Sequence, residues 1–217
     1  MGKGKCMRFI VSGILIFFAF NVYGATSKNS IWLGTFSKKE LSENYSAWVE
    51  AQLRYGLDQG GANQILYRTG LLYSLSQNHE LGFLYAFIQS GLQREHRLTF
   101  QHSQKYGHWL SLNFSHRARL EARFLEDSDD DAGRFRYLIR GEGELSSTPS
   151  FVIWDEVFVN TTSDSWTGDF AQNRNRLFVG VKVKVFNSRS EIGYLNQYVR
   201  RSAGDVSEHI ATIYWFF

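Results

Sequence analysis

Charged residues at every second position are the feature of this chain with the clearest chemical meaning. Within residues 117–123, Arg117, Arg119, Glu121 and Arg123 alternate with alanine and leucine. Guanidinium and carboxylate groups form forked pairs of hydrogen bonds, so arginines and glutamates on one face of neighbouring strands can cross-link that face. The same alternation elsewhere predicts one shared charge network, made of Glu95, Arg97, Arg117, Arg119, Glu121, Arg123, Arg136, Arg140, Glu142, Glu156 and Arg176.

Acyl transfer or hydrolysis would need a different arrangement, a nucleophile beside a base that a carboxylate orients. The histidines do not offer it, because His96, His102 and His116 fall on the apolar face of the strand pattern. The sequence also contains no metal-ligand spacing, phosphate loop or serine elbow. We therefore expect no catalytic residue, no metal site and no cofactor, and keep an outer-membrane enzyme acting on lipid as an alternative.

The elements that would carry these residues are β-strands, because apolar and polar residues alternate with period two along most of the chain. The pattern is clearest in 110–124, where one face is apolar except for His116 and the other is polar or charged. It is less regular in 151–160. There the frame that turns Glu156 to the charged face turns Asp155 to the apolar face, which predicts a bulge or a strand end.

Connections between the predicted strands alternate in length when they are counted back from the C-terminus, as the external and periplasmic connections of outer-membrane barrels do. The pattern predicts an all-β fold, an antiparallel up-and-down transmembrane β-barrel of ten strands over residues 45–217. Residues 25–44 then form an N-terminal segment, or, through 31–36, one half of a further pair in a barrel of twelve strands. The compared connections are 200–206 against 187–189, 161–172 against 146–149, 125–132 against 104–107, and 57–63 against 76–78.

Both ends of the chain predict export to the bacterial outer membrane. Residues 1–24 combine a basic start with an apolar run at 9–20, which is typical of a cleaved signal peptide. That run is shorter than the roughly 20 residues of a transmembrane helix. At the other end Ile213, Trp215 and Phe217 form an alternating aromatic terminus, the usual insertion signal of outer-membrane barrels. The expected partners are outer-membrane lipid, lipopolysaccharide and the barrel-assembly machinery, with the protein itself a monomer.

The charge balance gives no support for a nucleic-acid partner. Residues 1–24 carry three of the 24 basic residues and none of the 21 acidic residues, which leaves 21 of each and a net charge of zero after cleavage. Cys6 is the only cysteine and lies within the removed segment, so the exported chain has no disulfide. An aromatic content of 16% with a negative mean hydropathy fits a membrane barrel, in which only alternate residues face lipid.

Two arrangements of the charged face are open. In a barrel of this size, pairs of arginine and glutamate can fill and close the interior, which would make the protein a structural barrel of the cell envelope. Because basic residues outnumber acidic residues by eleven to seven on this face, a narrow channel for small anionic solutes is an alternative. A soluble barrel of the lipocalin type would instead turn its apolar face inward and its charged face outward.

The order of several short motifs resembles a known bacterial family. These motifs are Glu95-His96-Arg97, Arg117 to Arg123, Arg134-Phe-Arg136-Tyr137, Asp155 to Asn160, Arg176 to Gly180 and Gly193-Tyr194. From Trp32 to the C-terminus the chain is similar to the family called domain of unknown function 2490 (DUF2490), which contains predicted outer-membrane barrels. The resemblance implies the barrel fold and the outer-membrane location. Because the family has no established activity, it implies no catalytic residue.

Overall fold

The structure, a computed structural model, describes residues 25–58, 62–109, 112–144, 149–162, 171–185 and 188–217. The predicted signal peptide, residues 1–24, lies outside these ranges. No helix within them has the length and apolar character needed to cross a membrane. The described chain forms eleven strands: β1 (Thr26–Glu40), β2 (Tyr45–Gly56), β3 (Ala62–Ser74), β4 (His79–Ser90), β5 (Gln93–Trp109), β6 (Leu112–Leu125), β7 (Asp131–Glu144), β8 (Ser150–Asn160), β9 (Gln172–Val185), β10 (Ser188–Val199) and β11 (Val206–Phe216).

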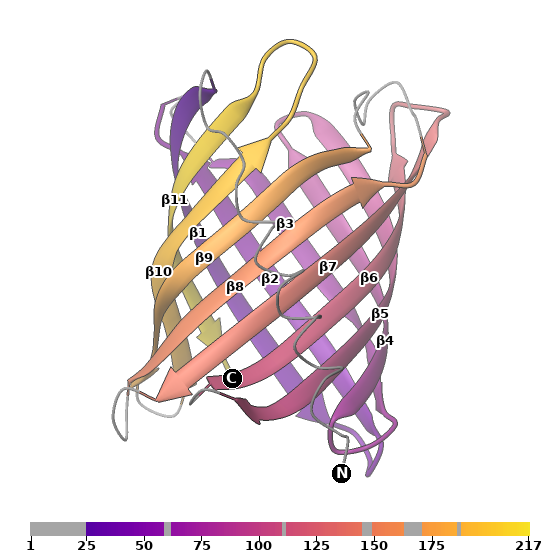
Figure 1. Cartoon of the computed structure of the whole chain (residues 1–217). Helices are drawn as coiled ribbons and strands as arrows, with labels where there is room; N and C mark the ends of the chain where they lie inside the picture. Colours follow the sequence, from indigo (N-terminus) through magenta and orange to yellow (C-terminus); the bar gives the residue numbers. More distant parts are fainter. Residues whose placement is uncertain (1–24, 59–61, 110–111, 145–148, 163–170, 186–187) are drawn as a thin grey trace, which may run out of the picture.

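The strands form one closed barrel in which each strand pairs with its neighbours in sequence and β1 closes the ring against β11 (Figure 1). Neighbouring strands are antiparallel except at this seam, where β1 and β11 run parallel from Thr26 opposite Val206 to Phe36 opposite Phe216. An odd number of strands requires a parallel seam, because an antiparallel meander then brings its first and last strands into the same direction. The seam also places Thr26 and Phe216 at opposite ends of the barrel.

The predicted antiparallel barrel is confirmed, but the predicted count of ten strands is one short. Residues 25–44, expected to form an N-terminal segment or half of an extra pair, contain β1. Both faces of this strand are apolar, since Trp32 and Phe36 point inward and Ile31 and Leu33 point outward. The strand therefore lacks the contrast between an apolar and a polar face that identifies its neighbours. The expected even number of strands also excluded it from the predicted barrel.

Connection lengths also differ in one place from the prediction. The longest connections, 161–171 and 200–205, lie at the end of the barrel where β1 begins, in agreement with the predicted alternation. The predicted connection at 104–107 is wrong, because β5 continues through it to Trp109. The ladder with β6 shifts register between Lys105 and His108, and this irregularity interrupts the apolar alternation without ending the strand.

Strand β8 keeps its alternation through Asp155, where a bulge or strand end was predicted. Asp155 is in register with both neighbouring strands. Its side chain lies on the outward face and accepts hydrogen bonds of 2.7 and 2.9 Å from the side-chain amide of Asn175. The irregularity of this strand lies further on, in a register shift between Phe158 and Val159 opposite β9.

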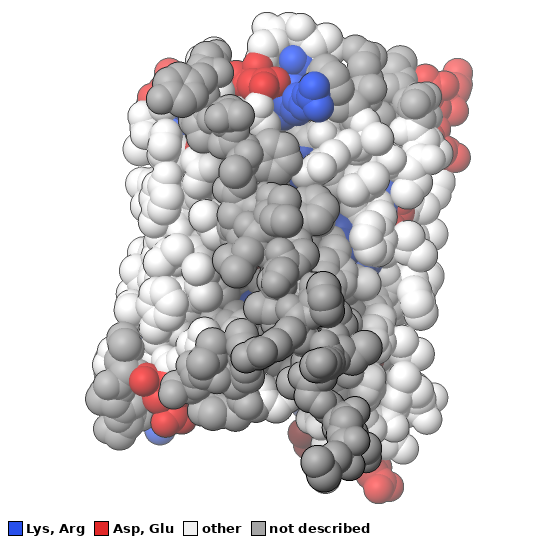
Figure 2. Space-filling view, viewed as in Figure 1, with Lys and Arg blue, Asp and Glu red and all other residues white. Residues whose placement is uncertain are grey.

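Apolar side chains cover the outer wall, and charged side chains lie inside. Phe83, Tyr67 and Leu120 are 61%, 56% and 54% exposed, whereas Glu121 and Glu156 are 3% and 2% exposed. In Figure 2 the acidic and basic atoms gather mainly at the two ends of the wall, and the described surface between them is almost uncharged. This distribution is the reverse of a lipocalin-type barrel, whose apolar face surrounds the interior.

One side of the interior also contains an apolar cluster that gives the charged groups a wall to pack against. The ring of Phe178 lies at its centre, stacked on Trp154 with 5.1 Å between ring centroids. Gly180 and Gly193 make room for this ring, since a Cβ atom at either position would lie 2.5 or 2.7 Å from it. The fully buried members of the cluster are Trp32, Val152, Phe178, Leu195 and Ile210.

Candidate functional site: the charged interior

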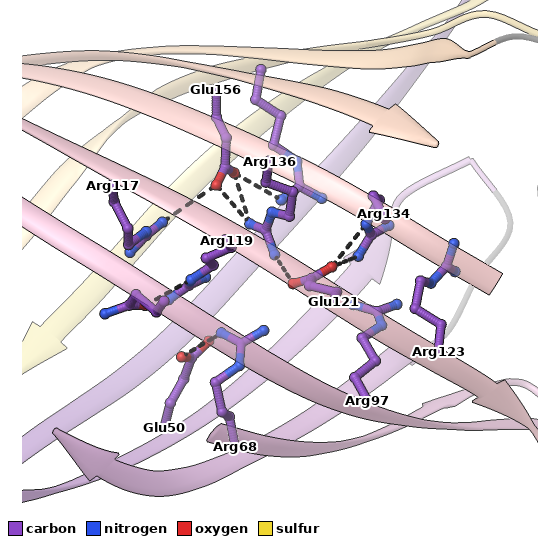
Figure 3. A network of polar contacts seen from close by, with 12 residues as sticks. Glu50, Arg68, Arg97, Arg117, Arg119, Glu121, Arg123, Arg134, Arg136 and Glu156 are labelled. Atoms are coloured by element: carbon purple, nitrogen blue, oxygen red, sulfur yellow. Dashed lines mark hydrogen bonds and ion pairs between the residues drawn. The ribbon is translucent and has the colours of Figure 1, made fainter. Parts of the chain in front are cut away.

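The centre of the interior is a network of shared carboxylates on β6, β7 and β8 (Figure 3). Arg136 binds two glutamates, with 2.7 Å from its Nη1 to Glu121 Oε1 and 2.8 Å from its Nη2 to both oxygens of Glu156. Glu121 also accepts two hydrogen bonds from Arg134, of which the bond from Nε measures 2.8 Å. The forked geometry of guanidinium groups allows one arginine to bridge two carboxylates in this way.

Glu156 has two further cationic neighbours. Arg117 of β6 approaches it to 3.4 Å and Arg176 of β9 to 3.8 Å, so that three arginines surround this carboxylate. Only 3% of its side chain is exposed. A buried carboxylate stays charged only when such partners replace the water it has lost.

Two smaller groups extend the network along the wall. The buried pair of Arg68 on β3 and Glu50 on β2 is separated by 2.7 Å. Glu95 of β5 accepts hydrogen bonds from Arg97, at 2.5 Å, and from Arg123 of β6, at 2.6 Å. Glu95 is therefore shared by two arginines, as Glu121 is.

Among the described residues, two ion pairs join strands that are not neighbours but are separated by two strands, and the first, Lys38 on β1 with Glu80 on β4, lies beside the cavity at one end of the barrel. The second lies deeper in the interior. Arg140 of β7 donates a hydrogen bond of 3.0 Å from Nη1 to Glu191 of β10. Two strands separate β7 from β10 in the sheet, so this contact passes through the interior instead of following the wall. Arg140 also reaches Glu142 at 3.1 Å, and Glu142 forms an ion pair with Lys182 of β9.

A second kind of arginine bonds amides and stacks on an aromatic ring. Arg54 donates hydrogen bonds of 2.5 Å to Gln64 and 2.9 Å to Gln52. Its guanidinium lies 3.9 Å from the centroid of the Trp32 ring, and that of Arg176 lies 4.9 Å from the same ring. The Trp32 ring thus makes cation–π contacts with two guanidinium groups, which the quadrupole of the ring favours.

Arg119 and Arg174 share one property with Arg54, the absence of a carboxylate partner among the described residues. Arg119 donates a hydrogen bond of 2.8 Å to Gln101. Arg174 lies 5.7 Å from the centroid of the Phe158 ring, and its buried Nε has no hydrogen-bond partner among the described residues. Within the described part of the chain, no carboxylate comes within ion-pair distance of Arg54, Arg119 or Arg174.

Cavities follow one another along the interior. The central cavity has a volume of about 200 Å³ and is lined by ten arginines and three glutamates. A cavity of about 580 Å³, next to the connection 75–78, shares Arg117, Leu138 and Arg140 with it. A cavity of about 150 Å³ at the opposite end shares Arg174 with it. Arginine side chains therefore lie between the central cavity and both ends of the barrel.

The structure turns every residue of the predicted charge network inward, and ten of the eleven take part in an ion pair. Arg119 is the exception. The prediction missed Glu50, Arg134 and Arg174, although all three lie in the same alternating frame. A count of every charged residue on that face would have included them.

The aromatic terminus completes the seam. Ile213 and Trp215 are paired with residues of β1 and alternate with side chains that line the interior. Phe217 is 70% exposed, and its backbone N–H donates a hydrogen bond of 2.9 Å to the carbonyl oxygen of Phe36. The role of these residues as an insertion signal stays a prediction.

Histidines on the outer wall lie beside tyrosines. Tyr85 Oη is 2.6 Å from His96 Nδ1, and His96 Nε2 is 3.0 Å from Glu126 in the connection after β6. The hydrogen bond with His96 lowers the pKa of Glu126. Across the described ranges, no group of three histidine, cysteine or acidic side chains is placed to hold a metal ion.

The fold and its interior define a class of protein, a closed β-barrel with an apolar outer wall and an interior of arginine and glutamate. Residues 29–208 match the family described as protein of unknown function (DUF2490), and the chain belongs to this family. The resemblance suggested by the short motifs is thereby confirmed. No curated protein and no solved structure matches the chain.

Proposed function

We propose that this protein is a barrel of the bacterial outer membrane whose own side chains close its interior, with a structural role in the cell envelope. The observation that supports this function most directly is the inside-out distribution of side chains, with Phe83 and Leu120 among the exposed residues of the wall. A hydrocarbon environment favours an apolar wall, and a closed ring of strands leaves no backbone edge without hydrogen bonds. In water the same wall would be a large exposed apolar surface, which promotes aggregation.

Features at the ends of the barrel support the same location. The rings of Tyr45 and Tyr73 lie 5.0 Å apart where β2 begins and β3 ends, and Tyr106 Oη lies 2.7 Å from His116 on the same half of the wall. Aromatic side chains are typical of the girdles at the two faces of a membrane barrel. Together with the predicted signal peptide at 1–24, they favour insertion after export.

Cell fractionation and heat-modifiable gel migration test the location. An outer-membrane barrel is expected in the outer-membrane pellet and migrates differently before and after boiling. Release of the protein by osmotic shock, without heat-modifiable migration, would contradict the proposal.

The aromatic terminus allows a test of insertion. Deletion of Phe217, or Trp215→Asp, is expected to lower the amount of heat-modifiable protein in the outer membrane, because each change alters the end of the seam strand. Leu92→Ala, at a 95% exposed side chain in the connection between β4 and β5, serves as the control. Normal levels in both terminal variants would contradict a role for these residues in insertion.

Closure of the interior is supported by the ion pairs that occupy it. The pair of Arg140 and Glu191 crosses the barrel, and Glu121 and Glu156 each bind arginines from more than one position. An open aqueous pore would not need these shared carboxylates. Breaking one would leave a buried charge.

A narrow passage for small anions is the second candidate. It is favoured by one observation, the series of cavities along the interior, whose shared walls are formed by Arg117, Leu138 and Arg140 on one side and by Arg174 on the other. Recording of purified protein in planar bilayers distinguishes the two functions. A closed barrel is expected to give no steady openings, whereas steady anion-selective openings of the wild type would favour the passage.

A further inference from the structure

The lining of the central cavity carries a large excess of positive charge. Ten arginines line it, against the carboxylates of Glu50, Glu156 and Glu191. Glu95, Glu121 and Glu142 pair with lining arginines from outside the lining, which makes six carboxylates in total. Glu208 adds a seventh carboxylate, because it accepts a hydrogen bond from Gln197, which itself accepts one from Arg176. Among the described residues, three of the ten guanidinium charges are therefore not balanced by glutamates in or next to the lining, and part of Glu95 and Glu142 is engaged by Arg123 and Lys182.

The excess is concentrated where Trp32 and Phe158 face the cavity. Arg54 lies over Trp32, Arg174 lies near Phe158, and Arg176 lies within 4.9 Å of both ring centroids. Arg54 and Arg176 share the Trp32 ring, so their guanidinium groups lie close enough to repel each other. Among the described residues, the one carboxylate within ion-pair distance of any of the three is Glu156, 3.8 Å from Arg176.

Three guanidinium groups around one enclosed cavity repel one another strongly, because the low dielectric of a protein interior screens charge poorly. Hydrogen bonds to amides and contacts with aromatic rings lower the free-energy cost of burying these cations, but they do not neutralise the positive charge. A small oxyanion would neutralise part of the charge, and each of its oxygens accepts hydrogen bonds from the forked donors of arginine. The unsatisfied Nε of Arg174 is one donor that such an anion would use.

We propose that the central cavity is a binding site for a small oxyanion of the phosphate or sulfate class, held between Arg54, Arg174 and Arg176. The volume of about 200 Å³ equals that of roughly six or seven waters, enough for one tetrahedral anion and part of its hydration shell. Arg174 also lines the neighbouring cavity of about 150 Å³, whose wall carries Lys28 and Arg201 together with Asp58 and Glu208. The site depends on the interior alone and not on where the protein is located.

Titration calorimetry of the purified full chain in a zwitterionic detergent tests the site, with inorganic phosphate as the probe and sodium chloride of equal ionic strength as the reference. Wild type is expected to bind one phosphate per chain with saturation, and sulfate is expected to compete. Arg54→Gln and Arg174→Lys are expected to weaken binding about tenfold or more, because each removes forked donors. Arg94→Gln, at an arginine that is exposed and paired with Glu126 outside the barrel, is the matched control and is expected to bind as the wild type does.

Heat-modifiable migration of each variant shows that it is folded before it is titrated. Arg174→Lys keeps the charge and so provides a folded variant if Arg54→Gln does not assemble. The proposal is overturned if phosphate gives no saturable binding to the wild type beyond that of chloride. It is also overturned if Arg174→Lys binds phosphate as tightly as Arg94→Gln does.

Discussion

Two groups of arginines in the interior of the same barrel are stabilised by different partners. Around Glu121 and Glu156, each carboxylate is shared by two or three arginines at short distance. Around Trp32, the guanidinium groups of Arg54 and Arg176 rest on the ring and bond amides. Phe158 lies between the two groups, because Arg134 and Arg136 contact its ring as well as Arg174 and Arg176.

The difference separates a structural role from a binding role. In the first group every carboxylate is paired without any ligand, so the group can act as a rigid closure of the barrel, although Arg117 Nε and Arg136 Nε have no hydrogen-bond partner among the described residues. The second group keeps net charge and unused donor capacity, which is the usual condition of an anion site. Both groups follow from the same alternation of residues, and only the distribution of glutamates distinguishes them.

The largest effect is expected from loss of a shared carboxylate. Glu121→Ala leaves Arg134 and Arg136 buried with one partner fewer, and the free energy of unfolding is expected to fall by about 3–5 kcal/mol. Urea unfolding in detergent, followed by tryptophan fluorescence, measures it. Lys38→Gln, which breaks the more exposed pair with Glu80, is the control and is expected to cost about 1 kcal/mol or less. Equal costs for the two variants would remove the distinction between the buried network and the more exposed ion pair at the end of the interior.

A matched pair of arginine substitutions tests the comparison itself. Arg136→Gln removes one cationic partner from both Glu121 and Glu156, so it is expected to lower the free energy of unfolding by about 3 kcal/mol or more. Arg119→Gln removes a cation that donates a hydrogen bond to the amide of Gln101, and is expected to lower the free energy of unfolding by about 1 kcal/mol. The same urea titration measures both. A larger loss for Arg119→Gln than for Arg136→Gln would show that the loss of a carboxylate partner does not set the cost of removing a buried arginine.

The smallest effect is expected on the outer rim. Since the hydrogen bond with His96 lowers the pKa of Glu126, its carboxylate stabilises the fold above the ordinary carboxyl range, and the contribution is lost as the pH falls through the lowered value. Glu126→Gln is therefore expected to lower the melting temperature slightly at about pH 7 and to have no effect at about pH 3. Thermal unfolding at the two pH values checks this. A difference that persists in acid would mean that the side chain acts through something other than its charge.

Much of this fold could be predicted from the sequence, because the alternation of apolar and polar residues identifies the strands and the face of each strand that points inward. Residues 110–124 show the frame plainly, and the inward charges follow from it. The first strand could not be predicted in this way, since both of its faces are apolar. The shift at Lys105 and His108 looks like a turn when only periodicity is available.

Pairing within the interior could be predicted less well. Alternation says that Arg119 and Arg136 face the same space, but register and strand tilt decide which glutamate each one meets. The contact of Arg140 with Glu191 crosses the barrel and has no signal in local spacing. The separation of the two arginine groups therefore became visible only in three dimensions.

The central claim is that the apolar face of the strands meets lipid while the charged face is enclosed, and site-directed fluorescence quenching tests it most directly. Cys6 lies in the predicted signal peptide, so single cysteines can be placed in the exported chain at Leu120→Cys, on the outer wall, and at Thr99→Cys, which is 0% exposed inside. A fluorophore at position 120 is expected to be quenched by lipid-borne quenchers in vesicles and not by iodide, while the cysteine at 99 is expected to resist labelling until the barrel is unfolded. Quenching of the label at 120 by iodide alone, with ready labelling at 99, would contradict the account.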